Sequence, residues 1–217
     1  MFKRFFDCIV AAGGLLILAP LFLAIGILIK LGSPGPIFYR APRVGRYGRH
    51  FNQLKFRSMW VGVPGPALTA GADPRITPLG RWLRWSKLDE LPQLWNVFRG
   101  QMSLVGPRPE APAYVAAYTD AQRRVLDLRP GITGLASVVY AHEEEHLSRP
   151  DFEGFYREVL LPRKLALELA YYHSATFVLD CRLLVYTLFA IVLPPARRKH
   201  WTDALVTSLS INPAFPT

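Results

Sequence analysis

CIVAAGGLLILAPLFLAIGILI, residues 8–29, is an uncharged run of 22 residues near the start of the chain. A helix of this length is long enough to cross the hydrocarbon core of a membrane. Pro20 lies near its middle, where a proline removes a helical hydrogen bond and clashes with the preceding turn. The run therefore predicts either a kinked membrane span or a helix–break–helix that re-enters the side from which it came.

Basic residues flank this run at both ends. Lys3 and Arg4 precede it, and the residues that follow it include Lys30, Arg40, Arg43, Arg46 and Arg49. Because basic flanks tend to stay in the cytoplasm, this distribution favours the re-entrant arrangement. The 217 residues include 26 Lys and Arg against 16 Asp and Glu, a net charge of +10. Phosphorylated lipid and nucleotide substrates explain this charge beside an apolar run better than nucleic acid does.

Further along, local patterns predict a small β-hairpin and several helices. Residues 37–40 and 50–57 are β-prone pieces around a Gly-containing turn at 44–48, and we expect them to pair. Residues 79–85 form a basic, aromatic-rich helix that suits a membrane interface, with an ordinary core helix as the alternative. Helical patterns also cover residues 112–128, 162–172 and 177–193. The chain is therefore expected to be α+β and mainly helical.

Two adjacent carboxylates stand before a predicted helix in Leu88-Asp89-Glu90-Leu91-Pro92. Pro92 suits the first turn of a helix, and apolar residues after it repeat at helical spacing. The helix dipole favours ionised carboxylates at this end. An ionised Asp89 can act as a nucleophile and Glu90 can hold a divalent cation. The alternative is a pair of acidic helix caps.

Candidate anion-binding cations lie in separate blocks of the sequence. Lys55 and Arg57 are two residues apart on a predicted strand, so we expect them to face the same side. A phosphate or diphosphate would be a natural partner for the pair, and exposed strand cations are the alternative. Arg108 stands between Pro107 and Pro109, which restrict its backbone and reduce the ordering cost of presenting its guanidinium.

These features occur within six blocks whose order resembles the bacterial sugar transferases known as monotopic phosphoglycosyl transferases. The resemblance extends over roughly residues 1–190. The blocks are SPGPIFYR (33–40), KFRSM (55–59), DPRITPLGR (73–81), LDELPQLWNV (88–97), MSLVGPRPE (102–110) and RPGITG (129–134).

The resemblance implies transfer of a phospho-sugar from a UDP-sugar to polyprenyl (undecaprenyl) phosphate, with UMP as the second product. Asp89 would attack the sugar-bearing phosphorus and form an aspartyl phospho-sugar. Mg²⁺ held by Glu90 would neutralise the diphosphate. The implied substrate-binding residues are Lys55, Arg57, Arg84, Pro107, Arg108, Pro109 and Arg129.

The resemblance, together with the basic flanks and a basic segment over 197–200, predicts an organisation of the chain and a location for it. A re-entrant membrane helix over 1–32 would anchor a catalytic domain over 33–194, followed by a basic tail over 195–217. The protein would lie on the cytoplasmic face of the bacterial inner membrane. UDP-sugar, polyprenyl phosphate and membrane lipid are the expected partners, nucleic acid is not, and a homodimer is left open.

One motif points to a different chemistry. His142-Glu143-Glu144-Glu145-His146 matches the zinc-protease pattern H-E-x-x-H, in which two histidines one helical turn apart bind zinc and the glutamate acts as base. A membrane-anchored zinc metalloprotease is therefore the alternative. Three consecutive glutamates look more like a solvated helix end. The protease would also leave Pro107-Arg108-Pro109 and the apolar run unexplained.

Overall fold

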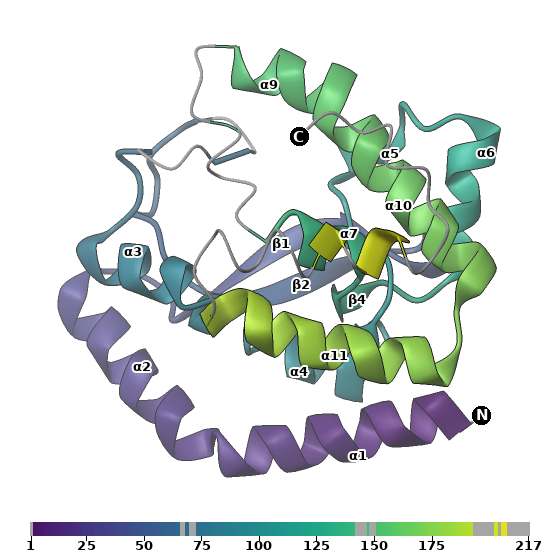
Figure 1. The fold of residues 1–217 in the computed structure, drawn as a ribbon. Helices are drawn as coiled ribbons and strands as arrows, with labels where there is room; N and C mark the ends of the chain where they lie inside the picture. Colours follow the sequence, from purple (N-terminus) through teal and green to yellow (C-terminus); the bar gives the residue numbers. More distant parts are fainter. Residues whose placement is uncertain are drawn as a thin grey trace.

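The computed structural model describes residues 2–65, 68–69, 73–141, 147, 151–192, 202–203 and 205–207. These residues form a mainly helical fold with two small two-stranded sheets (Figure 1). The predicted class, α+β with mostly helix, is confirmed. The predicted basic tail and His142–His146 lie largely or wholly outside the described residues.

The N-terminal apolar run folds as two helices, α1 (Phe2–Ile17) and α2 (Ala19–Gly32), bent by 59°. The break lies beside Pro20, as predicted, and Pro20 falls in the first turn of α2, where its missing N–H has no helical partner to lose. In the described part of the chain no single helix has the length and composition to cross a membrane. The bent pair reaches that length and composition only when both helices are counted together.

The charged residues ahead of the apolar run bind the rest of the protein. Lys3 donates to Asp180 at 2.6 Å, and Arg4 donates to the carbonyl oxygen of Val97 at 2.6 Å. Asp7, only 3% exposed, accepts from the Ser103 hydroxyl at 2.8 Å and from the N–H of Leu104 at 3.2 Å. The first two turns of α1 are therefore hydrogen-bonded to the domain that follows.

The predicted hairpin is present. Strand β1 (Phe38–Val44) pairs antiparallel with β2 (His50–Phe56) through the short turn η1 (Arg46–Gly48). A second sheet, in which β3 (Ser103–Val105) runs parallel to β4 (Gly131–Thr133), was not predicted. Its three-residue strands are too short to show the period-two pattern by which strands are identified in a sequence.

Helices over 78–85, 161–174 and 177–192 follow the predictions, whereas those over 135–139 and 152–160 were not predicted. The segment predicted as one helix over 112–128 is helical in three short pieces, because Thr119 forms a capping box with Gln122 and starts a new helix there. The segments are α3 (Pro78–Trp85), η2 (Leu88–Glu90), α4 (Gln93–Phe98), α5 (Pro112–Val115), α6 (Asp120–Arg123), η3 (Arg124–Asp127), α7 (Leu135–Val139), α9 (Phe152–Phe155), η4 (Tyr156–Leu160), α10 (Leu161–Ser174) and α11 (Phe177–Val192).

Three apolar clusters hold these elements together. The largest joins α1, α4, β3, α7, α10 and α11 around Val97, Leu135 and Leu183, which are fully buried. A second surrounds Tyr156, and a small third one joins α2 to the hairpin and α3 through Ile29, Phe56 and Leu83. The η2–α4 junction therefore sits on packed elements on several sides.

Candidate active site

The two predicted carboxylates lie in η2, directly before α4. Lys87 takes a left-handed conformation (φ 57°) that turns the chain into η2, and Pro92 stands at the N-cap of α4. Neither carboxylate caps a helix, since η2 and α4 begin with no side-chain cap hydrogen bond. The alternative that Asp89 and Glu90 are only acidic helix caps is therefore wrong.

Buried amides fix α4 against the hairpin. Gln53 on β2 donates to the Gln93 side chain at 2.8 Å. Asn96 accepts from the N–H of Leu54 at 2.9 Å and donates to the carbonyl oxygen of Asn52 at 2.8 Å. These bonds place the end of β2 opposite η2. Lys55, two residues beyond Gln53, therefore faces the carboxylates.

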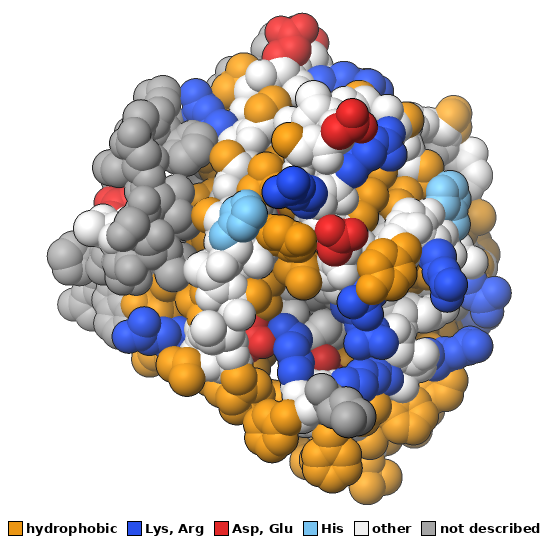
Figure 2. Space-filling model, turned by 90° about the vertical axis from the view of Figure 1, so that its right-hand side faces the viewer, with side chains coloured by type: hydrophobic (Ala, Val, Ile, Leu, Met, Phe, Trp, Pro, Cys, Tyr) orange, Lys and Arg blue, Asp and Glu red, His pale blue; other side chains and the backbone are white. Residues whose placement is uncertain are grey.

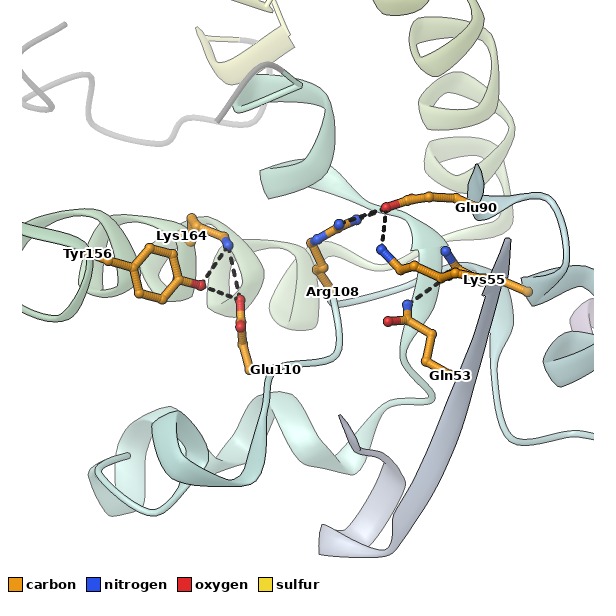
Figure 3. A network of polar contacts seen from close by, with 8 residues as sticks. Gln53, Lys55, Glu90, Arg108, Glu110, Tyr156 and Lys164 are labelled. Carbon is orange, nitrogen blue, oxygen red and sulfur yellow. Dashed lines mark hydrogen bonds and ion pairs between the residues drawn. The ribbon is translucent and has the colours of Figure 1, made fainter. Parts of the chain in front are cut away.

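Glu90 is bound by two cations from different parts of the chain. Its Oε1 accepts from Lys55 Nζ at 2.8 Å and from an Arg108 guanidinium nitrogen at 2.9 Å (Figure 3). Burial alone would raise the pKa of Glu90, but Arg108 and Lys55 hold it well below its usual value. Burial in turn lowers the pKa of Lys55 from 10.5, against the attraction of Glu90. Glu90 is thus an ionised carboxylate held between two charges.

Asp89 has a different environment. It is only 5% exposed, and in the described part of the chain its Oδ1 has no hydrogen-bond donor. Burial raises its pKa to about 6, although the charges of Lys55, Arg84 and Lys87 act in the opposite direction. At neutral pH the carboxylate is mostly ionised, desolvated and free of donors on one oxygen. These are properties of an oxygen nucleophile.

The structure brings together only part of the predicted substrate-binding set. Lys55 and Arg108 meet at Glu90, and Arg84 on α3 acts on Asp89 through its charge. The expectation that Lys55 and Arg57 face the same side is wrong. Strand β2 ends at Phe56, and the Arg57 guanidinium turns to carbonyl oxygens at the end of α2, those of Ser33 (2.8 Å) and Pro34. This placement gives Arg57 a structural contact.

The loop after β3 carries Arg108 and both flanking prolines. Gly106 packs so closely on the Arg129 carbonyl oxygen that a Cβ there would collide with it. Pro107 accepts from the N–H of Gly131 at 2.9 Å, and Arg108 donates its backbone N–H to Glu168 at 3.2 Å. Arg129 therefore supports this loop through its backbone. No hydrogen bond from its guanidinium to Glu90 occurs in the described part of the chain.

Four further residues belong to this region and were not predicted to. Glu110 follows the Pro107-Arg108-Pro109 segment, while Tyr156, Lys164 and Glu168 lie on η4 and α10. Tyr156 and Lys164 contact Glu110, and Glu168 contacts Arg108, across 46 to 60 residues of chain. Only Glu110 carried a signal, its position beside the proline pair.

Exposed aromatic side chains lie on the two helices beside the site. Figure 2 shows another face, the right-hand side of Figure 1 away from α3, where Lys and Arg side chains gather above large hydrophobic side chains along the lower edge. On α3, Trp82 and Trp85 are 50% and 72% exposed, and on α4 Trp95 and Phe98 are each 45% exposed. Aromatic side chains exposed in this way are common where proteins meet a membrane interface.

Glu90 fits a magnesium ion that is shared with a ligand. Among the described residues, no group of three or more His, Cys, Asp or Glu side chains is arranged to hold a metal ion. Mg²⁺, however, usually takes one or two carboxylates and completes its shell with phosphate oxygens and water. Glu90, held ionised beside Asp89, supplies such a carboxylate.

Comparisons with known proteins agree on one class of enzyme. A family model described as bacterial sugar transferase matches residues 1–194. The chain is 39% identical over 195 residues to undecaprenyl-phosphate glucose phosphotransferase of Komagataeibacter xylinus, covering 86% of this chain and 35% of that one. It is 46% identical over 141 residues to UDP-glucose:undecaprenyl-phosphate glucose-1-phosphate transferase of Caulobacter vibrioides, covering 63% and 53%.

A shorter relative is similar over most of its length. The exopolysaccharide production protein ExoY of Sinorhizobium fredii is 37% identical over 171 residues, covering 71% of this chain and 76% of that protein. By contrast, the chain spans 35% and 53% of the length of the Komagataeibacter and Caulobacter proteins. No relative named here is a protease.

Proposed function

Because the chain belongs to the bacterial sugar transferase family, we propose that it transfers a phospho-sugar from a UDP-sugar to undecaprenyl phosphate. The products would be undecaprenyl diphosphate-sugar and UMP. The observation that carries this proposal is that Oδ1 of buried Asp89 has no hydrogen-bond donor among the described residues and lies beside a Glu90 held by Lys55 and Arg108. The names of the relatives support the same substrates, and nothing supports the zinc protease.

In the first step Asp89 Oδ1 attacks the phosphorus that bears the sugar. A P–O bond forms to Asp89, the P–O bond to UMP breaks, and UMP leaves with the bonding electron pair. The product on the protein is an aspartyl phospho-sugar. Burial assists this step because Oδ1 is shielded from solvent and, among the described residues, has no hydrogen-bond donor to give up before it attacks. Splitting one displacement into two is the usual advantage of covalent catalysis.

The cations around Glu90 offset the charge of the incoming diphosphate. Lys55 and Arg108 converge on one oxygen of Glu90, so a diphosphate beside Asp89 would lie close to both. A guanidinium can hold two phosphate oxygens at once, whereas Lys55 contributes a point charge. Glu90 would hold Mg²⁺ together with the diphosphate, and the ion would supply further charge neutralisation there.

In the second step an oxygen of undecaprenyl phosphate attacks the same phosphorus. The bond to Asp89 breaks, its carboxylate is restored, and the diphosphate-linked lipid is released. The acceptor is a lipid, so the site must lie at a membrane surface. The exposed tryptophans of α3 and the exposed apolar residues of α4 suit contact with lipid at that surface.

The bent helix pair supports a re-entrant anchor on the cytoplasmic face of the inner membrane. Lys3, Arg4 and Asp7 hold the start of α1 against the domain that carries Asp89. A full span would put the two on opposite sides of the membrane and break these bonds. Contact with membrane lipid belongs to this proposal, and a homodimer stays a prediction.

A direct test uses the detergent-solubilised full chain with undecaprenyl phosphate and a panel of radiolabelled UDP-sugars. The proposal expects one UDP-sugar to give a labelled lipid extractable into organic solvent, together with UMP. With the UDP-sugar alone, intact-protein mass spectrometry should detect a gain equal to one phospho-sugar. Transfer without any protein-bound intermediate would overturn the covalent step, and no labelled lipid from any sugar would overturn the function.

A further inference from the structure

Glu110 ends the loop that carries Arg108, and it is held by a closed triangle of hydrogen bonds. Its Oε1 accepts from the Tyr156 hydroxyl at 2.7 Å and from Lys164 Nζ at 3.0 Å, and Lys164 also donates to the Tyr156 oxygen at 3.0 Å. Figure 3 shows this triangle on one side of the loop and the Arg108–Glu90 contact on the other.

The triangle is buried and charged. The side chains of Lys164 and Glu110 are 5% and 13% exposed. Burial alone would raise the pKa of Glu110, but the Lys164 charge and the two hydrogen bonds hold it below its usual value. A buried ion pair of this kind contributes little net stability compared with apolar packing, but it holds its side chains in one arrangement. This points to a role in placing the loop.

One continuous helical segment makes all of these contacts. Tyr156 opens η4, a π-helical turn over Tyr156–Leu160, and Lys164 and Glu168 follow on α10. In an α-helix each residue advances about 100°, so residues seven apart differ by only about 20° in direction and residues eight apart by about 80°. Tyr156 and Lys164 are eight apart. The wider π turn absorbs the extra residue and aims both side chains at Glu110.

The segment holds the loop at two points that flank the Arg108 side chain. Glu168 accepts the Arg108 backbone N–H at 3.2 Å, and the triangle fixes Glu110 two residues later. Pro109 lies between them, and its fixed φ leaves little freedom to absorb a displacement. A shift of Glu110 is therefore passed to Arg108, whose guanidinium reaches Glu90.

We propose that Tyr156 and Lys164 are positioning residues, which hold the Arg108 guanidinium at the active site by fixing Glu110. The inference rests on the proposed function, in which Arg108 contacts the diphosphate of the nucleotide-sugar. It adds Tyr156 of η4 and Lys164 of α10 to the residues that determine diphosphate binding, although in the described part of the chain no hydrogen bond or ion pair given for the site joins them to Asp89 or Glu90.

The test is a double-mutant cycle read out as affinity for UDP, measured by calorimetry on the solubilised full chain. Tyr156→Phe removes one hydroxyl and keeps the ring in its cluster. Tyr114→Phe is the matched control: its ring packs on Tyr156 at 5.0 Å between centroids, but its hydroxyl makes no hydrogen bond to Glu110 in the described part of the chain. Glu110→Gln, which keeps the shape of the side chain, is the second variant, and melting temperatures show that each variant folds.

We expect Tyr156→Phe and Glu110→Gln to weaken UDP binding about tenfold, as for a lost hydrogen bond to a charged group, and Tyr114→Phe less than about twofold. With Arg108 already replaced by Ala, Tyr156→Phe should weaken binding by less than about twofold, since residues acting through one another are not additive. Equal losses in both backgrounds, or no loss from Tyr156→Phe or Glu110→Gln, would overturn the positioning role. If Arg108→Ala alone leaves UDP affinity unchanged, the assignment of Arg108 in the proposed function fails, and this inference fails with it.

Discussion

Asp89 and Glu90 are adjacent in the chain, yet their surroundings shift their pKa values in opposite directions. Burial raises the pKa of Asp89 to about 6, while Arg108 and Lys55 outweigh burial at Glu90 and lower its pKa. Two carboxylates whose pKa values are separated in this way can take separate roles. Asp89 fits the role of the nucleophile, and Glu90 fits the role of an ionised carboxylate that binds cations.

Asp89→Asn tests the nucleophile. We expect transfer to fall on the order of 10³-fold or more, because the reacting oxygen is replaced, and the mass gain with UDP-sugar alone to disappear. The melting temperature should not fall, since the amide has nearly the same shape and removes a buried charge. A variant that retains a tenth of the activity would exclude Asp89 as the nucleophile. Asp127→Asn, an exposed acid, is the control.

Glu90→Gln tests the charge at the centre of the site. The variant keeps the shape of the side chain but loses the anion that Lys55 and Arg108 contact, and we expect severe loss of transfer.

In the wild type, EDTA should stop transfer and Mg²⁺ should restore it, because oxygen ligands beside a diphosphate suit that ion. Full activity in EDTA would remove magnesium from the proposal.

The raised pKa of Glu168 predicts a stability that depends on pH. Burial raises its pKa from 4.5 to about 8, although the Arg108 N–H and the Lys164 charge oppose this and Glu110 adds to it. Between these two values the folded protein binds more protons than the unfolded chain, so this residue makes stability fall as pH rises from about 5 to 8. We expect Glu168→Gln to show a shallower fall in denaturant melts. An unchanged slope would contradict the raised pKa.

Among the elements, α1 combines an apolar outer surface with a polar attachment to the domain. Phe5 and Ile9 are 66% and 55% exposed, while Asp7 is 3% exposed. Asp7→Ala would leave the Ser103 hydroxyl and the Leu104 N–H buried without an acceptor, which costs about 1–3 kcal/mol. Denaturant unfolding of the solubilised chain measures this loss. Glu158→Ala, at an exposed position, should change stability by less than about 0.5 kcal/mol. Similar losses in both variants would mean that the Asp7 contacts do not anchor α1.

For the whole molecule, the α1 contacts predict that both ends of the bent helix pair share the side of the catalytic domain. In a chain without Cys8 and Cys181, single cysteines at Phe2 and at Glu153, both exposed, can be labelled with a membrane-impermeant reagent. We expect both to react in inverted membrane vesicles and neither in intact spheroplasts. Reaction of the two cysteines from opposite sides would establish a full span and reject the re-entrant anchor.

The sequence by itself determined the features that depend on local backbone chemistry. Pro20 set the break between α1 and α2, the Gly-containing turn set the hairpin, and Pro92 marked the start of α4. It also identified the acidic pair, together with Lys55 and Arg108 as cations for one site. These signals were readable because proline, glycine and helical periodicity restrict the chain within a few residues.

Only the tertiary structure decided which of the predicted charges meet and which are buried. Arg57, two residues from Lys55, turns away to the end of α2, and Lys3 and Arg4 bind the domain. Tyr156 and Lys164 reach Glu110 across 46 and 54 residues. Desolvation and ion pairing depend on which elements pack together, and a local sequence pattern does not show which distant elements those are. The raised pKa of Asp89, and the nucleophilic role proposed for it, therefore depend on the tertiary packing.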